Sequence, residues 1–508
     1  MLGKKTKITE KNMENNNNLQ GLSNEVDIRK QKILNLENQG EIVYKEKFER
    51  THTICDAREL PEGTKVKVAG RMVFRRVMGK FGFMQIRDLI AKIQVSVGVN
   101  ELDAEAYEFY KKMIDIGDFV GVEGELYKTQ TGEVTVRAYK VVLLSKAMRP
   151  LPEKFHGLTD LEAKYRQRYL DLISNEESRE VFIGRSKLLS YIRKFLGDNG
   201  FMEVETPIIQ SAVCGASAKP FFTHHNALDK DFNLRIAPET YLKQCICAGF
   251  DRVFEVAKCF RNEGMDTQHL QEFTQVEWYA SYWNFEDNIV FFQKFIRGLL
   301  LELTGKTTIE KDGQLLDFGK EFERLNYTER MKEILGFDFL EYSDPEALKQ
   351  KIIEGGLFTR AEIDDYKSLS QIIDFVYKKT IREKIVQPTI LYNYPAVLIP
   401  LARRNDADKR IIDVFQVVVM GTEVCKAYSE LVDPIVQRKA FEDQLIAKSQ
   451  GDDETMDLDE GFMLSMEHGM PPISGLGCGL DRLLMLIYNQ PSVPGRRKRS
   501  RPRPFRAG

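Results

Sequence analysis

The sequence lacks long apolar runs and paired cysteines. No stretch of about 18 apolar residues occurs in the chain, so no segment is expected to span a membrane. Its lysine-rich start continues into asparagine-rich rather than apolar sequence, so we do not expect this start to be a secretory signal peptide. The seven cysteines include no CxxC pair, so neither a zinc knuckle nor a redox motif is expected. Free thiols are typical of a reducing compartment, and we expect a cytoplasmic protein.

The sequence also lacks an excess of charge of either sign. Its 74 Lys and Arg residues nearly balance 76 Asp and Glu residues, for a formal net charge of −2. No global basic field therefore indicates nucleic-acid binding, and any RNA contact must come from local patches. Hydrophobic residues make up 43% and charged residues 30%, as in ordinary soluble proteins. A chain of 508 residues is too long for one compact core, so we expect two or three domains.

The first part of the chain changes pattern twice. Residues 1–22 are Lys- and Asn-rich, cannot bury enough apolar surface to fold, and are expected to be disordered. Residues 23–60 have a charged, helical pattern. Between residues 61 and 146 the hydrophobic period becomes two, which predicts five short strands with a helix at 104–113 after the third. This order predicts an OB-fold barrel, a fold that commonly binds single-stranded nucleic acid by stacking bases on aromatic side chains.

The rest of the chain mixes helices and strands. An amphipathic helix is expected at 179–196, ended by Gly197 and Gly200, and a mostly helical surface insertion at about 324–385. A hairpin is expected from arms at 252–261 and 272–279. Taken alone, this hairpin would most simply be exposed, with a solvated polar face, because buried charges are costly unless they are paired. By alternation, one face of its second arm carries Phe273, Gln275, Glu277 and Tyr279.

Three segments, taken in order, indicate that this hairpin belongs to a functional site. GFMEVETPII at 200–209, FRNEG…EFTQVEWY at 260–279 and GLGCGLDR at 475–482 resemble the three signature motifs of class II aminoacyl-tRNA synthetases. LRIAPE, THHNALD, RNEG and YSEL resemble the lysine-specific members of that class, and the match extends from about residue 57 to residue 493. The resemblance implies an α+β architecture. An N-terminal OB-fold β-barrel at 61–146 would precede a class II catalytic domain at 147–493, built on an antiparallel sheet.

The resemblance also implies a function. A lysine enzyme of this class would activate L-lysine with ATP to lysyl-adenylate, with Mg²⁺ as cofactor, and transfer the lysyl group to lysine-accepting tRNA. It would act as a homodimer joined through the helix and strand of the first motif. Three alternatives remain open. A same-fold aspartate or asparagine enzyme is disfavoured by a carboxylate-rich pocket, a protein-lysylating paralogue would lack the barrel, and a tRNA-binding pseudo-enzyme would have an inactive core.

Implied site residues follow from positions in these motifs. Arginine grips phosphate oxygens in pairs, which suits a reaction that positions and neutralises phosphates, and the implied catalytic residues are Arg261 and Arg482. The implied ATP-binding residues are Arg261, Glu263, His269, Phe273, Glu423 and Arg482, and the implied metal ligands are Glu423 and Gln416. A buried ammonium group needs carboxylates around it. The implied lysine-binding residues are Gly215, Glu239, Glu277, Tyr279, Tyr428 and Glu430.

In the barrel, the resemblance implies anticodon contacts. Phe83 would stack on a base, and polar groups would read base edges. Alternation alone leaves Phe83 equally well placed in the barrel core. The implied set is Arg75, Arg76, Phe83, Gln94 and Glu133.

The chain departs from the family pattern at four places. Lys426 replaces the usual Asn, and Gln416 replaces a usual metal-binding Glu, which should weaken Mg²⁺ binding. The loop reads His269-Leu270-Gln271 where His-Asn-Pro is usual. Lys or Arg occupies seven of the last thirteen positions, where the family continues its catalytic domain. For residues 494–508 we expect either a solvated, disordered basic tail that contacts RNA or an aberrant ending.

Overall fold

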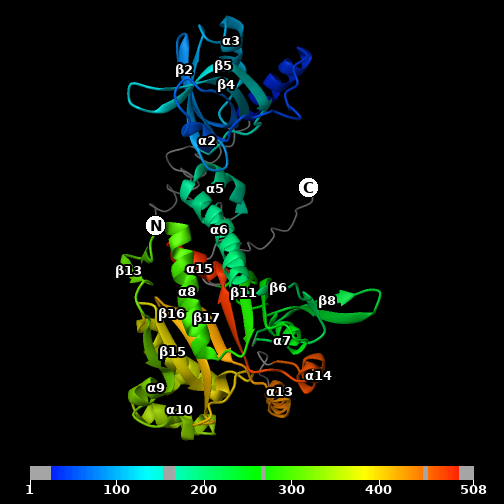
Figure 1. Ribbon diagram of the computed structural model, residues 1–508, viewed down its shortest axis with the longest axis vertical. Helices are drawn as coiled ribbons and strands as arrows, with labels where there is room; N and C mark the ends of the chain where they lie inside the picture. The colour runs from blue at the N-terminus through cyan, green and yellow to red at the C-terminus, as the bar shows by residue number, and fades with distance from the viewer. Residues whose placement is uncertain are drawn as a thin grey trace, which may run out of the picture. The chain divides into compact units, whose positions relative to one another are not determined.

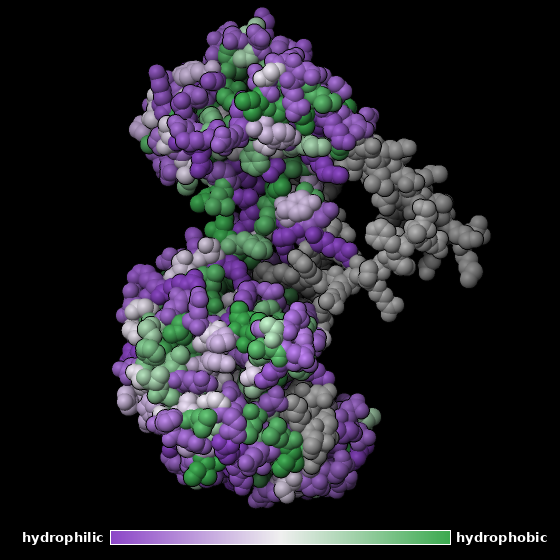
Figure 2. Space-filling model, turned by 90° about the vertical axis from the view of Figure 1, so that its right-hand side faces the viewer, coloured by the Kyte–Doolittle hydropathy of each residue, from purple (hydrophilic) through white to green (hydrophobic). Residues whose placement is uncertain are grey.

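The computed structural model describes residues 24–152, 164, 166–216, 218–264, 269–449 and 456–490 (Figure 1). The segment expected to be disordered at 1–22 and the basic tail at 494–508 lie outside these residues. The chain divides between Asn175 and Glu176 into two compact units. Among the described residues, none of the helices has the length and hydropathy needed to cross a bilayer. The face shown in Figure 2 is largely hydrophilic, with apolar side chains scattered over it.

A closed five-stranded barrel forms the core of the first unit, in the order β1-β2-β3-β5-β4. Alternation builds it: along β2, Met84 and Ile86 are buried in the barrel, whereas Phe83 and Gln85 are only partly buried on the outer face. The predicted OB-fold barrel, with its helix after the third strand, is confirmed. The elements of this unit include α2 (Ile54–Arg58), β1 (Lys65–Met78), β2 (Phe81–Arg87), β3 (Lys92–Gly98), α3 (Ala104–Met113), β4 (Phe119–Lys128), β5 (Val134–Ser145) and α5 (Arg168–Ser174).

An eight-stranded sheet organises the second unit, in the order β14-β15-β16-β17-β18-β11-β10-β6. Neighbouring strands run antiparallel except for the pairs β6/β10 and β14/β15. The predicted hairpin is confirmed as β10 and β11. The strands are β6 (Met202–Glu203), β10 (Arg252–Phe260), β11 (Glu272–Ser281), β14 (Glu323–Asn326), β15 (Thr389–Pro395), β16 (Ile411–Val419), β17 (Thr422–Ser429) and β18 (Ile473–Gly479).

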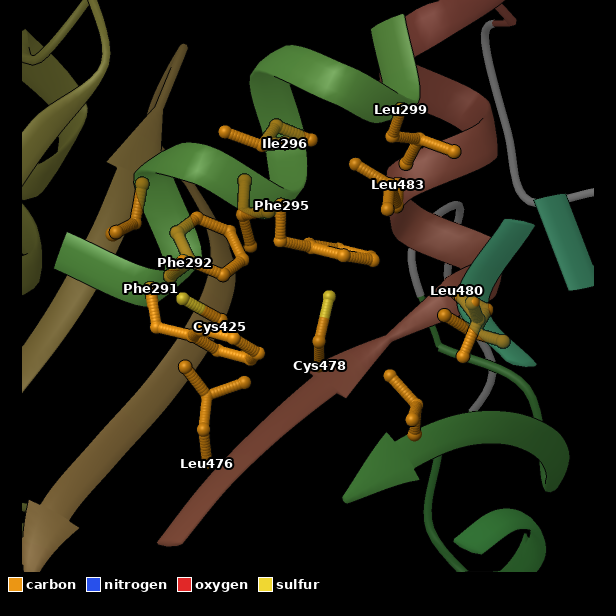
Figure 3. Packing of buried hydrophobic residues seen from close by; sticks show 14 of the residues in the cluster. Phe291, Phe292, Phe295, Ile296, Leu299, Cys425, Leu476, Cys478, Leu480 and Leu483 are labelled. Atoms are coloured by element: carbon orange, nitrogen blue, oxygen red, sulfur yellow. The ribbon is translucent and has the colours of Figure 1, made fainter. Parts of the chain in front are cut away.

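Helices cover one face of this sheet and bury its apolar side chains. Helix α8 (Phe285–Thr304) packs on β16, β17 and β18 (Figure 1). Its Phe292 and Phe295 cluster with Cys425, Leu476 and Cys478 of the sheet (Figure 3). Full burial of one large apolar side chain stabilises a fold by about 1.5–3 kcal/mol. With this face packed, the opposite face of the sheet is left for polar residues.

The predicted amphipathic helix at 179–196 is confirmed as α6 (Glu176–Asp198). Gly197 lies inside the helix rather than ending it, and Gly200, with a φ of +81°, makes the turn that follows. The helix of the third motif is α15 (Leu480–Ile487). Both helices pack on the same apolar core as α8, so they fix the ends of the strands that carry the first and third motifs.

The insertion at about 324–385 is mostly helical, as expected, and has an apolar core of its own that continues onto the sheet. The rings of Tyr327, Tyr377 and Tyr394 cluster there, with Tyr327 centroids 4.8 Å from Tyr377 and 4.3 Å from Tyr394. The insertion contains α9 (Tyr327–Leu335), η1 (Phe339–Glu341), α10 (Pro345–Glu354), α11 (Arg360–Ile363), α12 (Leu369–Thr380) and η2 (Arg382–Lys384). The other elements of the unit are β7 (Ile209–Gln210), β8 (Phe221–His225), β9 (Lys230–Leu234), α7 (Glu239–Cys247), β12 (Thr308–Lys311), β13 (Gln314–Asp317), η3 (Ala396–Leu398), α13 (Pro434–Ser449) and α14 (Glu460–Glu467).

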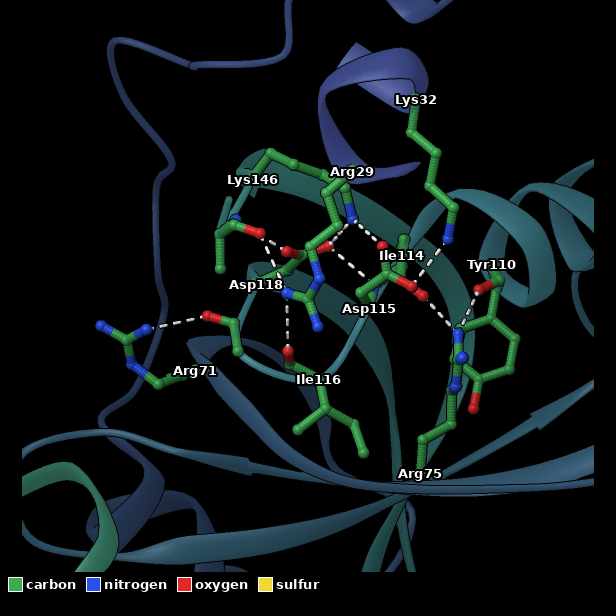
Figure 4. Close-up of polar contacts among 12 residues, drawn as sticks. Arg29, Lys32, Arg71, Arg75, Tyr110, Ile114, Asp115, Ile116, Asp118 and Lys146 are labelled. Carbon is green, nitrogen blue, oxygen red and sulfur yellow. Dashed lines mark hydrogen bonds and ion pairs between the residues drawn. The ribbon is translucent and has the colours of Figure 1, made fainter. Parts of the chain in front are cut away.

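In the first unit, a cluster of ion pairs fastens the N-terminal helix, residues 24–38, to the barrel (Figure 4). Lys146 Nζ lies 2.5 Å from Asp115 Oδ2 and 2.6 Å from Asp118 Oδ2. From the helix, Lys32 Nζ lies 2.7 Å from Asp115 Oδ1, and Arg29 donates to two backbone carbonyls beside the barrel. Because each buried charge has an opposite partner, the helix is held in one position on the barrel.

Candidate active site

Two adjoining cavities, of about 360 and 450 Å³, open on the polar face of the sheet in the second unit. The second cavity contains Gln416 and shares Arg261, Glu423 and Arg482 with the first. Glu430 lies behind the wall of the first cavity. The predicted residues that line the first cavity are Gly215, Glu239, Arg261, Glu263, His269, Phe273, Glu277, Tyr279, Glu423, Tyr428 and Arg482.

Strands β11 and β18 form the wall of the first cavity. Glu277 and Tyr279 of β11 face the cavity, as alternation predicts, and Gly477 and Gly475 lie opposite them on β18. A Cβ atom at Gly475 would collide with the Tyr279 ring and lie 2.6 Å from Glu430 Oε1. The glycine at 475 therefore leaves the room that these large polar side chains occupy.

Glu277 is buried in this wall with neutral donors beside it. Gln275 Nε2 donates to Glu277 Oε1 at 2.6 Å, and the Tyr279 hydroxyl donates to Oε2 at 3.1 Å. Burial, with a smaller contribution from the negative charge of Glu239, raises the pKa of Glu277 to about 8. A carboxylate accepts more than these two bonds. The site is therefore suited to a cation, which would stabilise the ionised form of Glu277.

Lys243 supplies a cation that the sequence-based set did not contain. It lies on α7 four residues after Glu239 and is 0% exposed. Its Nζ lies 2.6 Å from Glu239 Oε1 and 2.5 Å from Glu430 Oε2. Burial alone would lower the pKa of Lys243, but the two carboxylates outweigh burial and raise it above its ordinary value. In the sequence, the indication of this ion pair is that Glu239 and Lys243 are four residues apart, a spacing that brings them together on one face of a helix.

Glu239 and Glu430 thus share a single buried counter-ion. Burial raises the pKa of Glu430 well above its ordinary value in spite of Lys243. The Tyr428 hydroxyl donates to Glu239 Oε1 at 2.6 Å. Gly215, with a φ of +88°, brings backbone so close that an added Cβ would lie 3.1 Å from Glu239 Cβ. This end of the cavity therefore combines an excess of carboxylates with a closely approaching main chain.

Two arginines lie toward the other end of the first cavity. The Arg261 guanidinium carbon lies 5.1 Å from the centroid of the Phe273 ring, a cation–π geometry. Arg482 belongs to the first turn of α15, next to Asp481, whose carboxylate pairs with Arg185 of α6 at 2.5 Å. That ion pair fixes the start of α15 and, with it, the backbone that presents Arg482.

Comparison with known proteins identifies this arrangement. The family described as tRNA synthetases class II (D, K and N) matches residues 160–495, and an OB-fold nucleic acid binding domain matches residues 66–144. A lysine–tRNA ligase of Enterococcus faecalis is 41% identical over 485 residues, which cover 94% of this chain and 96% of that protein. That of Escherichia coli K12 is 43% identical over 486 residues, covering 93% and 95%. The chain belongs to the class II lysine–tRNA ligases.

Membership of this family confirms the predicted fold class and enzyme class. The relatives named above are lysine–tRNA ligases, and nothing in the similarity supports an aspartate or asparagine enzyme, a protein-lysylating paralogue or a pseudo-enzyme. The matches cover both units: the OB-fold match falls in the first, and the synthetase match begins at residue 160, near the end of the first unit, and continues through most of the second.

The two predicted metal ligands of the enzyme lie on neighbouring strands, Gln416 on β16 and Glu423 on β17. Gln416 Oε1 already accepts a hydrogen bond from the Tyr394 hydroxyl at 2.8 Å. Gln416 also lies directly opposite Lys426 in the strand register. Within the described ranges, no group of three or more His, Cys, Asp and Glu residues lies close enough to hold a metal ion. The pair therefore offers one carboxylate and one neutral amide oxygen that already accepts a hydrogen bond.

On the barrel, the structure separates the five predicted anticodon residues into two groups. Phe83 lies directly opposite Arg76 and outside the barrel core. Gln94 lies on the adjacent strand β3, and Glu133 immediately precedes β5, which pairs with β3. Arg75 instead donates to three carbonyls at the end of α3, so it serves that helix. All five residues thus lie on or beside neighbouring strands, but the Arg75 side chain is bonded to the end of α3 and does not share the surface of the other four.

Proposed function

We propose that the first cavity binds L-lysine and ATP, forms lysyl-adenylate, and then delivers the lysyl group to lysine-accepting tRNA. Glu277 and Tyr279 would receive the ε-ammonium group, with Glu430 adding negative charge from behind Gly475. Glu239 and the Gly215 backbone would hold the α-ammonium group, and Tyr428 would orient Glu239.

The observation that carries this proposal is the excess of buried carboxylates. Glu239 and Glu430 share one internal cation, Lys243, and the side chains that donate hydrogen bonds to the third carboxylate, Glu277, are the neutral Gln275 and Tyr279. A substrate ammonium group would supply the missing positive charge. An aspartate side chain would instead bring a further carboxylate, which such a pocket rejects.

At the nucleotide end, the chemistry requires positioning and charge neutralisation. A carboxylate oxygen of lysine attacks the α-phosphorus of ATP, and the bond from that phosphorus to the bridging oxygen breaks as pyrophosphate leaves. Arg261 would bind the α-phosphate and the attacking carboxylate, and Arg482 the γ-phosphate. Phe273 and Glu263 would frame the adenine, and His269 would reach the terminal phosphates. A terminal ribose hydroxyl of the tRNA then attacks the lysyl carbonyl carbon, and AMP leaves.

Mg²⁺ would enter with ATP, because phosphates supply much of its coordination in such sites. Glu423 is the one carboxylate that we assign to it, with Gln416 as a neutral oxygen. Because Gln416 carries no charge and its oxygen already accepts one hydrogen bond, the residues present do not fit a tightly held ion. Each step above is therefore assigned to side chains of the protein.

The same proposal extends to the rest of the chain. Residues 61–146 would bind the anticodon and residues 147–493 would form the catalytic domain. A homodimer is supported by Met202, Ile208 and Ile209, exposed apolar side chains on the first-motif segment. A cytoplasmic location is supported by the seven cysteines, all of which are free.

ATP–pyrophosphate exchange with each amino acid in turn tests the function. Lysine should support exchange, whereas aspartate, asparagine and norleucine should not. Exchange supported equally by aspartate, or by no amino acid, would refute the proposal.

The lysine dependence of this reaction should change with pH. Because the pKa of Glu277 is about 8, its carboxyl group is mostly protonated in the empty site at neutral pH. The lysine ε-amine stays charged up to about pH 10, so kcat/KM for lysine should fall by about tenfold for each pH unit below 8. Between the pKa of Glu277 in the unfolded chain and about pH 8, the folded state binds a proton on Glu277 that the unfolded state has lost. The contribution of Glu277 to stability therefore falls as pH rises through this range.

Exchange rates at subsaturating lysine and saturating ATP, measured from pH 6 to 9, provide the test. The KM for ATP at saturating lysine serves as control and should not follow the same profile. A flat lysine profile between pH 6 and 8 would mean that Glu277 is ionised throughout.

The anticodon role of the barrel gives a separate prediction. Phe83→Ala should lower kcat/KM for tRNA in the charging reaction by a factor that corresponds to about 1–3 kcal/mol, the energy of one lost base stack. It should leave pyrophosphate exchange unchanged. Phe119→Ala is the matched control, since Phe119 is an exposed aromatic of the same barrel, on β4, that contacts Arg71. The control should charge tRNA normally. An equal loss in charging and exchange for Phe83→Ala would indicate a structural role.

A further inference from the structure

The second cavity contains a cationic side chain, Lys426, next to Gln416, one of the two residues predicted to bind the metal ion. The family usually has a neutral Asn in place of Lys426. Lys426 on β17 lies directly opposite Gln416 on β16, and both line this cavity. Directly opposed residues of an antiparallel pair share one face, with Cβ atoms about 4.5–5.5 Å apart. The Lys426 side chain has no ion pair or hydrogen bond with any residue that the structure describes. Its ammonium group is therefore available to a ligand.

Hydrogen-bond donors predominate around the same cavity. Arg261, Arg382 and Arg482 line it together with Lys426. These four cationic side chains favour an anionic, acceptor-rich occupant. A phosphate chain is such an occupant.

Acceptors for a metal ion are scarce by comparison. Asp374 is paired with Lys378 at 2.5 Å, and the Gln416 oxygen accepts from Tyr394 at 2.8 Å. Glu423 is the remaining carboxylate of this lining. Mg²⁺ is held by carboxylates and phosphates in near-octahedral geometry. One carboxylate beside several fixed cations therefore supplies too few protein ligands to hold Mg²⁺ well.

We propose that Lys426 is a fixed cation that contacts the polyphosphate chain of ATP directly and replaces the charge of one nucleotide-bound metal ion. This inference rests on the proposed function of the site. It also explains together two departures of this chain from its family, Lys426 in place of Asn and Gln416 in place of Glu. A glutamate at position 416 would pair with Lys426 across the strands and neutralise it, whereas Gln416 leaves the ammonium group unpaired.

ATP binding in the presence of EDTA tests the proposal without requiring catalysis. Calorimetry should show that Lys426→Asn weakens metal-free ATP binding by about 10- to 100-fold, the range for one charge-assisted hydrogen bond. Gln416→Glu should produce a similar loss by pairing with Lys426. Lys378→Asn is the matched control, because Lys378 lines the same cavity but is already paired with Asp374, and its ATP affinity should stay within about twofold of the wild type.

The double variant Lys426→Asn/Gln416→Glu completes the cycle. It should bind ATP weakly in EDTA and regain affinity steeply as Mg²⁺ is added, with a stronger Mg²⁺ dependence than the wild type. If Lys426→Asn binds ATP in EDTA as tightly as the wild type, or if all four proteins have the same Mg²⁺ titration, the proposal is refuted. Lysine-dependent exchange by the wild type at saturating Mg²⁺ is measured in parallel, because its absence would refute the proposed function and not the role of Lys426.

Discussion

Glu277→Gln should reduce kcat/KM for lysine in ATP–pyrophosphate exchange by about 10²- to 10⁴-fold. The substitution keeps the size of the side chain but removes the charge opposite the substrate ammonium group. Breaking a buried ion pair at one partner costs about 3–5 kcal/mol, and about 1.4 kcal/mol corresponds to each factor of ten. The loss should be confined to lysine, because Arg261 and Arg482, which we assign to ATP, are unchanged.

Norleucine, which is lysine without its ε-amine, makes this test specific. A site built to bind a polar substrate group can reject an analogue lacking it by about 10⁴-fold, and Glu277→Gln should erase most of that discrimination. Glu272→Gln is the matched control on the same strand, because Glu272 is exposed and pairs with Lys258 at 3.2 Å. Glu430→Gln should have a smaller effect, since Glu430 lies behind Gly475 and is paired with Lys243. Unchanged selectivity in Glu277→Gln would show that the ε-ammonium group binds elsewhere.

Local patterns sufficed to predict several elements of this fold, among them the barrel strands, the helix α6 and the hairpin of β10 and β11. Alternation along β2 and β11 follows from the strand repeat of two, and the α3 helix at 104–113 was predicted with the bounds that the structure gives it. The strand order of the large sheet could not be predicted in this way. β18 lies beside β11 although about 200 residues separate them, and periodicity within a strand carries no information about which strand becomes its neighbour.

The candidate site shows the same division between local and long-range information. Alternation places Glu277 and Tyr279 on one face, but the glycines that make room for them belong to another strand. Arg75 and Arg76 were both predicted to contact RNA, although adjacent strand residues point to opposite faces, and the structure directs Arg75 to the end of α3. That separation could have been inferred from alternation alone.

The insertion and Lys243 show what the sequence pattern conceals. No chemistry was predicted for the insertion, yet Tyr327 and Arg382 line the second cavity. A lysine in a short polar helix is typical of a solvated surface, and lysine is almost never fully buried unless it is paired. The two carboxylates that pair with Lys243 come from its own helix and from the residue after β17, a contact that folding alone creates.

Lys243→Met should destabilise the catalytic unit and weaken lysine binding together. Methionine preserves much of the side-chain volume but leaves Glu239 and Glu430 buried without their cation. Removing one member of a buried ion cluster costs about 3–5 kcal/mol, which should lower the melting temperature by roughly 5–15 °C. Burial already raises the pKa of Glu430 in the presence of Lys243, so without that cation Glu430 should be protonated more readily, the pocket should lose negative charge and the KM for lysine should rise.

The pH dependence of that loss separates charge from packing. In Lys243→Met the folded pKa of Glu430 should lie still further above its unfolded value, so the folded state binds more protons and stability falls as pH rises above that unfolded value. The melting temperature of the variant should therefore recover toward the wild type at pH 5. Lys349→Met is the matched control, because Lys349 is also 0% exposed but pairs with Glu346 on α10. It should lose stability without changing the KM for lysine. An equal loss of melting temperature for Lys243→Met at pH 5 and pH 8 would mean that Lys243 acts through packing and does not set the charge of the pocket.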